Sequence, residues 1–314
     1  MAKYILRRIL MLIPVIIGVT LFVFTIMDMS PGDPAMIILG ESATPEAVAA
    51  LREELGLNAP LLSRYVRYML NMLRGDLGTS YKNSLNVAGQ IAERLPNTML
   101  LAFSGMLIAL IIGIPAGIIS AKKQYTLWDN FFTVFALIGQ AAPAFWLGLM
   151  LVIAFSLNLR WFPSSGMGRG FEGVLHSLIL PAITVASPSA AVITRMTRSS
   201  MLEVIHQDYN DTARAKGVKE SIIIFRHMLK NALIPIITVV GLQTGILLSG
   251  SVLTETVFSW PGLGRYMMES IKTKDMPPVL GSVIVLSIVF TVVNLLVDVL
   301  YAFADPRIKS QYKG

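Results

Sequence analysis

Few residues of this chain are of the types that carry catalytic chemistry. Its 314 residues include no cysteine, and the three histidines, His176, His206 and His227, are scattered. Such a set offers neither the clustered ligands of a zinc site nor a Cys–His nucleophile. The G-x-x-x-x-G-K-[ST] loop that holds nucleotide phosphates does not occur in the sequence. We therefore expect no catalytic centre, no metal site and no cofactor bound by this chain.

The polar stretch DYNDTARAKG, residues 208–217, indicates a short binding helix instead. Asp208 can cap the helix, with Asp211 at the capping-box position, and Gly217 is a natural C-terminal stop. Acidic residues at the start and basic residues at the end suit the helix macrodipole. The face that this helix would present carries Tyr209, Thr212, Ala213 and Lys216.

A second helix is predicted over 219–233, with Pro235 as its end. Its apolar face would consist of Ile222, Phe225, Leu229 and Ala232. The two helices together would form a stiff knob that fits a groove of another protein. For 219–233 the alternative is a helix resting on lipid, whereas 208–217 has no apolar face wide enough for that.

The composition places these helices in a polytopic, all-α membrane protein, because 54% of the residues are hydrophobic and 14% are charged. A membrane span needs about 20 mostly apolar residues. Six stretches qualify: 9–27, 98–119, 131–155, 176–194, 234–253 and 279–303. The first follows three basic residues and lacks a small-x-small cleavage site, so it is interpreted as an uncleaved anchor over 1–27. The fourth is the weakest, since Pro181 and Pro188 interrupt it.

The distribution of charge predicts the orientation. With six spans, both termini and the loop at about 196–233 lie on one side, which carries 15 Lys and Arg residues, whereas the short loops on the other side carry five. The positive-inside rule then places the N terminus, the C terminus and this loop in the cytoplasm. The net charge of +7 is explained by the membrane surface, so we expect no nucleic-acid partner.

The segment 28–96 is predicted to be extracytoplasmic and helical. Thr44 and Pro45 form a helix start and Gly56 a stop. A second helix would place Leu61, Tyr65, Tyr68, Met69 and Met72 on one face, and a third would align Val87, Ile91 and Leu95. These helices either lie on the membrane surface or form a lid packed on the bundle.

Small and polar residues within the spans indicate close helix packing and a pathway. Glycine and alanine recur at four-residue steps at Gly105, Ala109, Gly113 and Gly117, and a second row contains Gly241, Gly245 and Ser249. Polar groups facing lipid are costly, so we expect the translocation pathway to be lined by Gln140, Ser187, Ser189, Gln243, Asn294 and Asp298. For Asp298 the preferred alternative is a pair with Arg307 or Lys309 near the end of the last span.

The segments DTARAKG and RHMLKNALIP resemble the EAA loop of ABC importer permeases, in the form of the dipeptide/oligopeptide/nickel family. The first half of the pattern matches in order at Asp211, Thr212, Ala213 and Gly217. In the second half the sequence departs from the pattern, because its proline comes five residues later, at Pro235. The segments RRILMLIPVIIGVTLFVF, SPGDPA, LGLNAPLLSRYVRYMLNMLRGDLGTSY, FSWPGLG and NLLVDVLYAFADPRIK are similar to the first of the two permeases of such systems.

This resemblance implies a type I ABC importer transmembrane subunit with a permease core over 97–314, in the bacterial cytoplasmic (inner) membrane. It implies a heterodimer with a second homologous permease, two ATPase subunits that use ATP and Mg, and an extracytoplasmic binding protein that delivers di- or oligopeptides. The ATPases would grip a coupling helix formed by Asp208, Tyr209, Asp211, Thr212, Ala213, Arg214, Lys216 and Gly217.

Three alternatives stay open at this point. A nickel or glutathione importer shares the same sequence frame. An ion-coupled secondary transporter would want a relay of buried carboxylates or histidines, of which Asp298 is the one candidate. A membrane protease would have to use Ser164 or Ser165, which have no convincing base and are interpreted as a turn.

Overall fold

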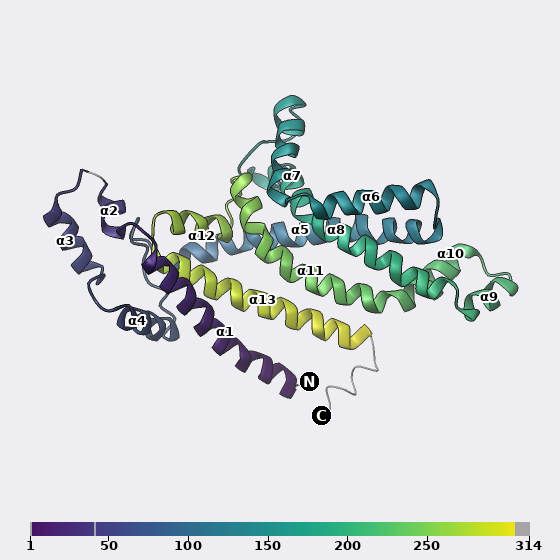
Figure 1. Cartoon of the computed structure of the whole chain (residues 1–314), viewed down its shortest axis with the longest axis horizontal. Helices are drawn as coiled ribbons and strands as arrows, with labels where there is room; N and C mark the ends of the chain where they lie inside the picture. Colours follow the sequence, from purple (N-terminus) through teal and green to yellow (C-terminus); the bar gives the residue numbers. More distant parts are fainter. Residues whose placement is uncertain (1, 41, 305–314) are drawn as a thin grey trace. The chain divides into compact units, whose positions relative to one another are not determined.

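The computed structural model describes residues 2–40 and 42–304; at 2–5, 9, 249–250 and 298–304 it describes the backbone alone. Within these ranges the chain is helical, with a single isolated β-bridge between Thr79 and Asn86 (Figure 1). The elements of the first half are α1 (Ala2–Met29), α2 (Pro34–Leu39), α3 (Pro45–Glu54), α4 (Leu61–Leu73), α5 (Val87–Lys122), α6 (Leu127–Ala141), α7 (Ala144–Leu151) and the π-helix η1 (Val152–Asn158). Those of the second half are α8 (Gly170–Ile205), α9 (Asp208–Ala215), α10 (Glu220–Ile222), the π-helix η2 (Ile223–Met228), α11 (Leu229–Val257), α12 (Leu263–Lys272) and α13 (Met276–Ala304).

The chain divides into two compact units. Unit 1 comprises Met1–Thr98 and Pro261–Thr291, and unit 2 comprises Met99–Trp260 and Val292–Gly314. Five helices are long and apolar enough to cross a membrane, and α6 with α7 and η1 forms a sixth candidate that is sharply bent. The prediction of an all-helical protein with six membrane spans is confirmed in this form.

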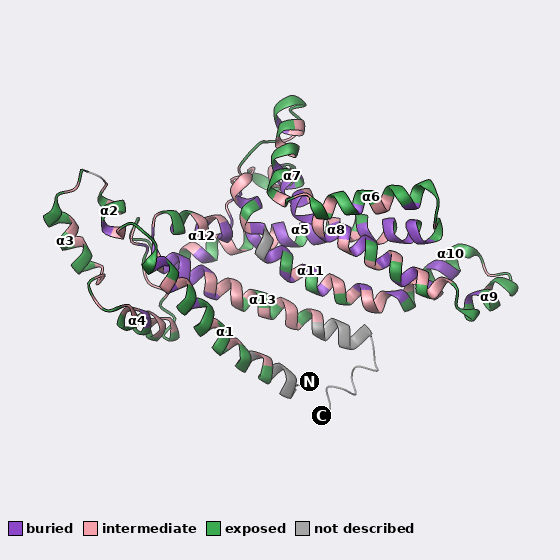
Figure 2. Cartoon of the chain, in the orientation of Figure 1, coloured by how far each residue is buried: buried purple, intermediate pink, exposed green. Residues whose placement is uncertain are grey.

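Helix α8 is the centre of unit 2, with α6, α7 and α11 packed against it. Of its most apolar 18-residue window, 72% is buried, compared with 12% for α1 (Figure 2). This fourth span is the least apolar of the five single-helix candidates, as expected, but the expected interruption by its prolines is wrong. Pro181 and Pro188 lie inside a continuous 36-residue helix, because a proline in a helix enclosed by protein is held in place by its neighbours.

The glycine row of α5 meets α8 directly. A Cβ atom at Gly117 would lie 2.5 Å from Cβ of Thr197 and 2.6 Å from the carbonyl oxygen of Thr194. One added at Gly113 would lie 2.8 Å from a methyl carbon of Ile193. The predicted close approach of helix backbones at these small residues is confirmed.

An ion pair connects α6 to α8 near the loops that the sequence assigns to the cytoplasm. The Arg198 guanidinium donates to both carboxylate oxygens of Asp129, at 2.7 and 2.8 Å, and the side chain of Asp129 is only 5% exposed. The hydroxyl of Ser120 on α5 and the backbone N–H of Tyr125 also donate to this carboxylate. Asp129 thus joins three helices.

The third span is broken rather than straight. The sequence predicted one stretch over 131–155, but α6 ends at Ala141, α7 begins at Ala144, and the two are inclined by 105°. Ala142 adopts an extended conformation immediately before Pro143. Proline disfavours a helical conformation in the residue before it, and here that preference turns the chain.

Unit 1 contains the helices predicted over 28–96. Thr44 caps α3, with its hydroxyl accepting from the N–H of Ala47, and Gly56 follows the helix at φ +66°. Two apolar clusters hold the unit: Tyr65 of α4 packs with Phe24 and Leu280, and Val87 and Ile91 of α5 pack with Leu263 and Tyr266. The predicted apolar faces of these segments are confirmed except at Met72, which belongs to neither cluster.

Candidate functional site

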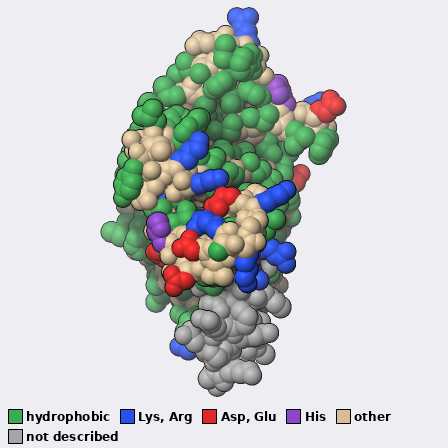
Figure 3. Space-filling model, turned by 90° about the vertical axis from the view of Figure 1, so that its right-hand side faces the viewer, with side chains coloured by type: hydrophobic (Ala, Val, Ile, Leu, Met, Phe, Trp, Pro, Cys, Tyr) green, Lys and Arg blue, Asp and Glu red, His purple; other side chains and the backbone are tan. Residues whose placement is uncertain are grey.

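The candidate site is the loop that carries α9, which the sequence assigns to the cytoplasm. Charged side chains of both signs gather on this face of the molecule (Figure 3). Most residues of α9 are exposed, as a docking element requires, and Tyr209 is 39% exposed. Of the predicted coupling residues, Asp208, Tyr209, Asp211, Thr212, Arg214, Lys216 and Gly217 are exposed, and Ala213 is half-buried.

The start of α9 differs from the expectation. Gln207 occupies the N-cap position, no side chain caps the helix, and Asp208 is its first residue. The predicted capping box of Asp208 and Asp211 is therefore wrong. Asp211 instead accepts a hydrogen bond from Arg214 at 2.8 Å, one turn further along. Both carboxylates still lie in the first turn, where they interact favourably with the macrodipole.

The end of α9 is as predicted. Gly217 has φ +76°, its N–H donates to the Arg214 carbonyl at 2.9 Å, and the Val218 N–H donates to the Ala213 carbonyl at 3.2 Å. These two bonds form a Schellman motif, which needs a residue in the left-handed region. The glycine fixes where the chain leaves the helix.

Three polar residues that the sequence analysis missed hold α9 in place. Asn210 is fully buried, and its amide donates to the Val204 carbonyl at the end of α8, at 2.7 Å. The amide of Asn231 on α11 donates to the Tyr209 hydroxyl at 3.0 Å. Arg214, which donates to Asp211, also donates to the Glu220 carboxylate, at 3.2 Å. A single buried Asn among charged neighbours carries no distinctive sequence signal.

The second predicted helix runs on into a membrane span. Pro235 lies inside α11 and does not end a helix, so that prediction is wrong. The N–H that Pro235 lacks would have donated to the Asn231 carbonyl, so the proline costs this helix one backbone hydrogen bond without ending it.

The buried face of this helix also differs. Of the predicted apolar face, Ala232 is buried and Leu229 packs against the same core, but Ile222 is 43% and Phe225 64% exposed. A neighbouring row packs into the core with Met201 in their place: Ile223, Ile224, Met228 and Ile236. The π-helix η2 explains the shift, because its wider turn brings residues five apart, such as Ile223 and Met228, onto one side.

The predicted pathway residues lie in different environments. Gln140 is exposed at the end of α6, and Ser187 and Asn294 are half-buried. Ser189 and Gln243 are buried, at 2% and 7% exposure. Ser187 lines an apolar cavity of about 310 Å³ between α5, α6 and α8. The side chain of Asp298, like the predicted partners Arg307 and Lys309, lies outside the described residues.

Comparisons with known proteins extend over the whole chain. Residues 113–310 match the family described as binding-protein-dependent transport system inner membrane component, and residues 1–102 match the N-terminal part of such components. The dipeptide transport system permease protein DppB of Alkalihalophilus pseudofirmus is 44% identical, over 98% of this chain and 100% of that protein. The oligopeptide transport system permease protein AppB of Bacillus subtilis is 42% identical, with the same coverage.

A solved structure shares the fold. The inward-facing MetNI methionine ABC transporter has a chain that is 16% identical, with a TM-score of 0.57 over 69% of this chain and 96% of that chain. At this identity the likeness concerns the fold alone, which is that of a type I ABC importer transmembrane subunit. The chain belongs to the binding-protein-dependent transport system inner membrane components and is a multi-pass permease subunit of the inner membrane.

Proposed function

We propose that this chain is a membrane-spanning subunit of an ATP-driven importer that moves di- and oligopeptides across the cytoplasmic membrane. The observation that carries the proposal is the full-length similarity, at 40–44% identity, to permeases named for dipeptide and oligopeptide transport. The similarity covers 98% of this chain, so a permease role explains both the N-terminal part and the core.

Helix α9 is the element proposed to receive force from the ATPases. Eight residues long and exposed, it is tied to α8 through Asn210 and to α11 through Asn231. A helix held at both flanks moves as a rigid piece with the spans behind it. Movement of a partner bound to α9 would therefore be transmitted to α8, the most buried span, because no flexible loop between them would absorb it.

The chemistry of transport is divided among subunits in this proposal. ATP and Mg are bound and ATP is hydrolysed by two soluble ATPase subunits, while this chain forms part of the moving wall. A second, homologous permease covers apolar surface that this chain leaves exposed, and an extracytoplasmic binding protein delivers peptide to the region 28–96. The pathway between the two permeases is lined by Gln140, Ser187, Ser189, Gln243, Asn294 and Asp298.

The end of α9 offers a sharp test of the coupling role. We expect Gly217→Val to reduce ATPase co-purification and peptide uptake, because a β-branched residue is strained at φ +76°. Nothing lies within 4 Å of a Cβ added at Gly217, so the effect would come from the backbone alone. Gly217→Asn is the matched control, since asparagine tolerates the left-handed region and should keep both activities.

The measurement is peptide uptake, together with the amount of ATPase retained by the purified complex. Full uptake by Gly217→Val with normal ATPase retention would refute the coupling role. Absence of peptide uptake by the complete wild-type system would refute the peptide assignment.

A further inference from the structure

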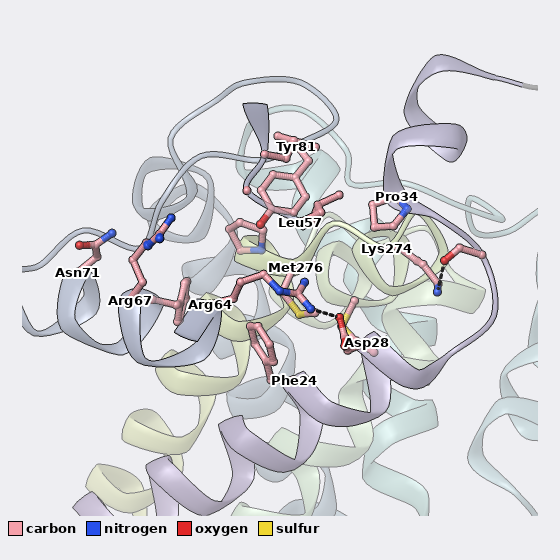
Figure 4. A pocket seen from close by; sticks show the side chains of 16 residues that line it. Phe24, Asp28, Pro34, Leu57, Arg64, Arg67, Asn71, Tyr81, Lys274 and Met276 are labelled. Atoms are coloured by element: carbon pink, nitrogen blue, oxygen red, sulfur yellow. Dashed lines mark hydrogen bonds and ion pairs between the residues drawn. The ribbon is translucent and has the colours of Figure 1, made fainter. Parts of the chain in front are cut away.

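Unit 1 contains a cavity of about 210 Å³ to which the proposed transport function assigns no role. It lies between the end of α1, the segment after α3, one side of α4, and the residues around the start of α13 (Figure 4). One part of its lining is apolar: Phe24, Met27, Leu55, Leu57, Met276 and Pro277. The other part carries three basic side chains, Arg64, Arg67 and Lys274, and one carboxylate, Asp28. The cavity is thus amphiphilic, with an excess of positive charge.

Two of the three cations are already occupied. The Arg64 guanidinium forms an ion pair with Asp28, donates to the Ala59 carbonyl at 3.1 Å, and lies over the Phe24 ring (Figure 4). The Lys274 ammonium donates to the backbone carbonyls of Ser30 and Gly32. These contacts build the wall and leave little capacity for a ligand.

The donors of one α4 face are not occupied. Within 2–40 and 42–304, the Arg67 guanidinium and the Asn71 amide have no hydrogen-bond or ion-pair partner. The hydroxyl of Tyr68 is buried and equally unpaired in the described part of the chain. A buried polar group without a partner costs free energy, so the unpaired Tyr68 hydroxyl indicates a missing ligand, and the exposed Arg67 guanidinium lines the same cavity.

The phenols of this cavity are donors at every physiological pH. Burial, followed by the charge of Asp275, raises the pKa of Tyr81 to about 12. Burial also raises the pKa of Tyr68, with a smaller contribution from Tyr81. Since both hydroxyls keep their protons, Tyr68 offers its hydrogen to an acceptor and does not repel an anion.

We propose that this cavity binds a carboxylate that carries an apolar substituent, which is the chemistry of the C-terminal residue of a short peptide. The Arg67 fork is suited to a carboxylate, with Tyr68 and Asn71 as further donors, and the apolar wall receives the substituent. An inorganic phosphate would leave that wall unfilled. The assignment to a peptide, though not the carboxylate chemistry itself, depends on the proposed function above.

The test is a binding titration of the purified full-length chain with the dipeptide Ala-Leu. We expect saturable binding that weakens about tenfold or more in Arg67→Gln, because glutamine cannot make the charge-assisted, bidentate bonds of the guanidinium. The C-terminal amide Ala-Leu-NH2 should lose affinity for the wild type similarly. Arg74→Gln is the matched control: Arg74 lies just after α4, is exposed and does not line the cavity, so its loss should leave the affinity unchanged.

Four results would overturn this proposal. They are no binding of Ala-Leu, equal affinity of wild type and Arg67→Gln for Ala-Leu, phosphate binding with the affinity of Ala-Leu, and Ala-Leu-NH2 binding with the affinity of Ala-Leu. Thermal unfolding of Arg67→Gln shows whether the variant is folded, and Arg67→Lys, which keeps the charge but not the fork, gives a second measurement. Failure here is distinct from failure of the proposed function. If the complete system imports Ala-Leu while this cavity binds nothing, only the cavity assignment is wrong.

Discussion

At the scale of single residues, the polar groups that matter most in this chain are buried ones. Asp129 accepts from Arg198, Ser120 and the Tyr125 backbone, while Asn210 holds α9 to the end of α8. Asp129 and Arg198 are 69 positions apart, and both occur in segments rich in other charges. No local spacing connects them, so the pair is visible only once α6 and α8 have packed. The Gly217 stop, by contrast, is set by two neighbouring turns of one helix and was predictable.

Breaking this ion pair should destabilise the chain measurably. Arg198→Gln leaves the nearly buried Asp129 carboxylate without its counter-charge, which typically costs about 3–5 kcal/mol. Because the Arg198 side chain is 28% exposed, water screens part of this, and we expect about 2–3 kcal/mol. The measurement is thermal unfolding in detergent.

Two further variants separate charge from shape in that experiment. Arg195→Gln, on the same helix and exposed, should unfold like the wild type. Asp129→Asn combined with Arg198→Gln should recover much of the lost stability, since no charge is then left unpaired. A single Arg198→Gln variant as stable as wild type would show that the pair contributes nothing.

At the scale of elements, the sequence predicted the spans and the helices of 28–96, but not how the helices join or which face of 219–233 is buried. The spans and the helices of 28–96 follow from apolar periodicity, and their faces pack as expected. Pro143 and Pro235 are both prolines in apolar surroundings, yet one turns the chain and the other lies within a helix. The difference depends on packing around each proline, which the local sequence does not encode. The local sequence does not encode the π-helix η2 either. This π-helix buries Ile223, Ile224 and Met228 in place of Ile222 and Phe225.

The contact between α5 and α8 gives a prediction for a pair of elements. Gly117→Ala should destabilise the chain by about 1–3 kcal/mol, the usual cost of inserting an extra carbon into a packed interface. One of the two nearest atoms is a backbone oxygen, at 2.6 Å, which has little room to move. Chemical or thermal unfolding in detergent would measure the change.

Gly18→Ala in α1 is the matched control for that variant. Nothing lies within 4 Å of a Cβ at Gly18, so the added methyl should be neutral or slightly stabilising, as alanine favours helices. Equal stability of the Gly117 and Gly18 variants would mean that α5 and α8 do not approach as closely as described.

At the scale of the whole molecule, this chain is built to work inside an assembly. Only 12% of the apolar window of α1 is buried within the chain, and the residues Trp128, Phe131 and Phe135 on α6 are 54%, 58% and 59% exposed. Lipid or a second permease must cover this surface. Family and membrane location were predictable because sequence segments along the whole length resemble one family. The pathway was less accessible, since which polar residues face a partner depends on a surface outside this chain.

The absence of cysteine makes that pathway testable, because each introduced thiol is the sole one. In the resting complex we expect Ser187→Cys and Asn294→Cys to react with a small polar thiol reagent. Ser189→Cys should stay unreactive until the helices separate, because that position is 2% exposed. The measurement is the labelling rate in each nucleotide state. Labelling of Ser189→Cys but not of Ser187→Cys at rest would exclude the proposed lining.

The uninterrupted length of α8 has a consequence for where partners meet this subunit. Between Glu172 and Arg195 the helix has no Asp, Glu, Lys or Arg residue, and these 23 steps rise about 35 Å, close to the thickness of the hydrocarbon layer. The remaining ten residues to Ile205 add about 15 Å, which carries the chain through the lipid headgroups before α9 begins. The proposed ATPase partner can therefore bind α9 from the aqueous side without displacing lipid.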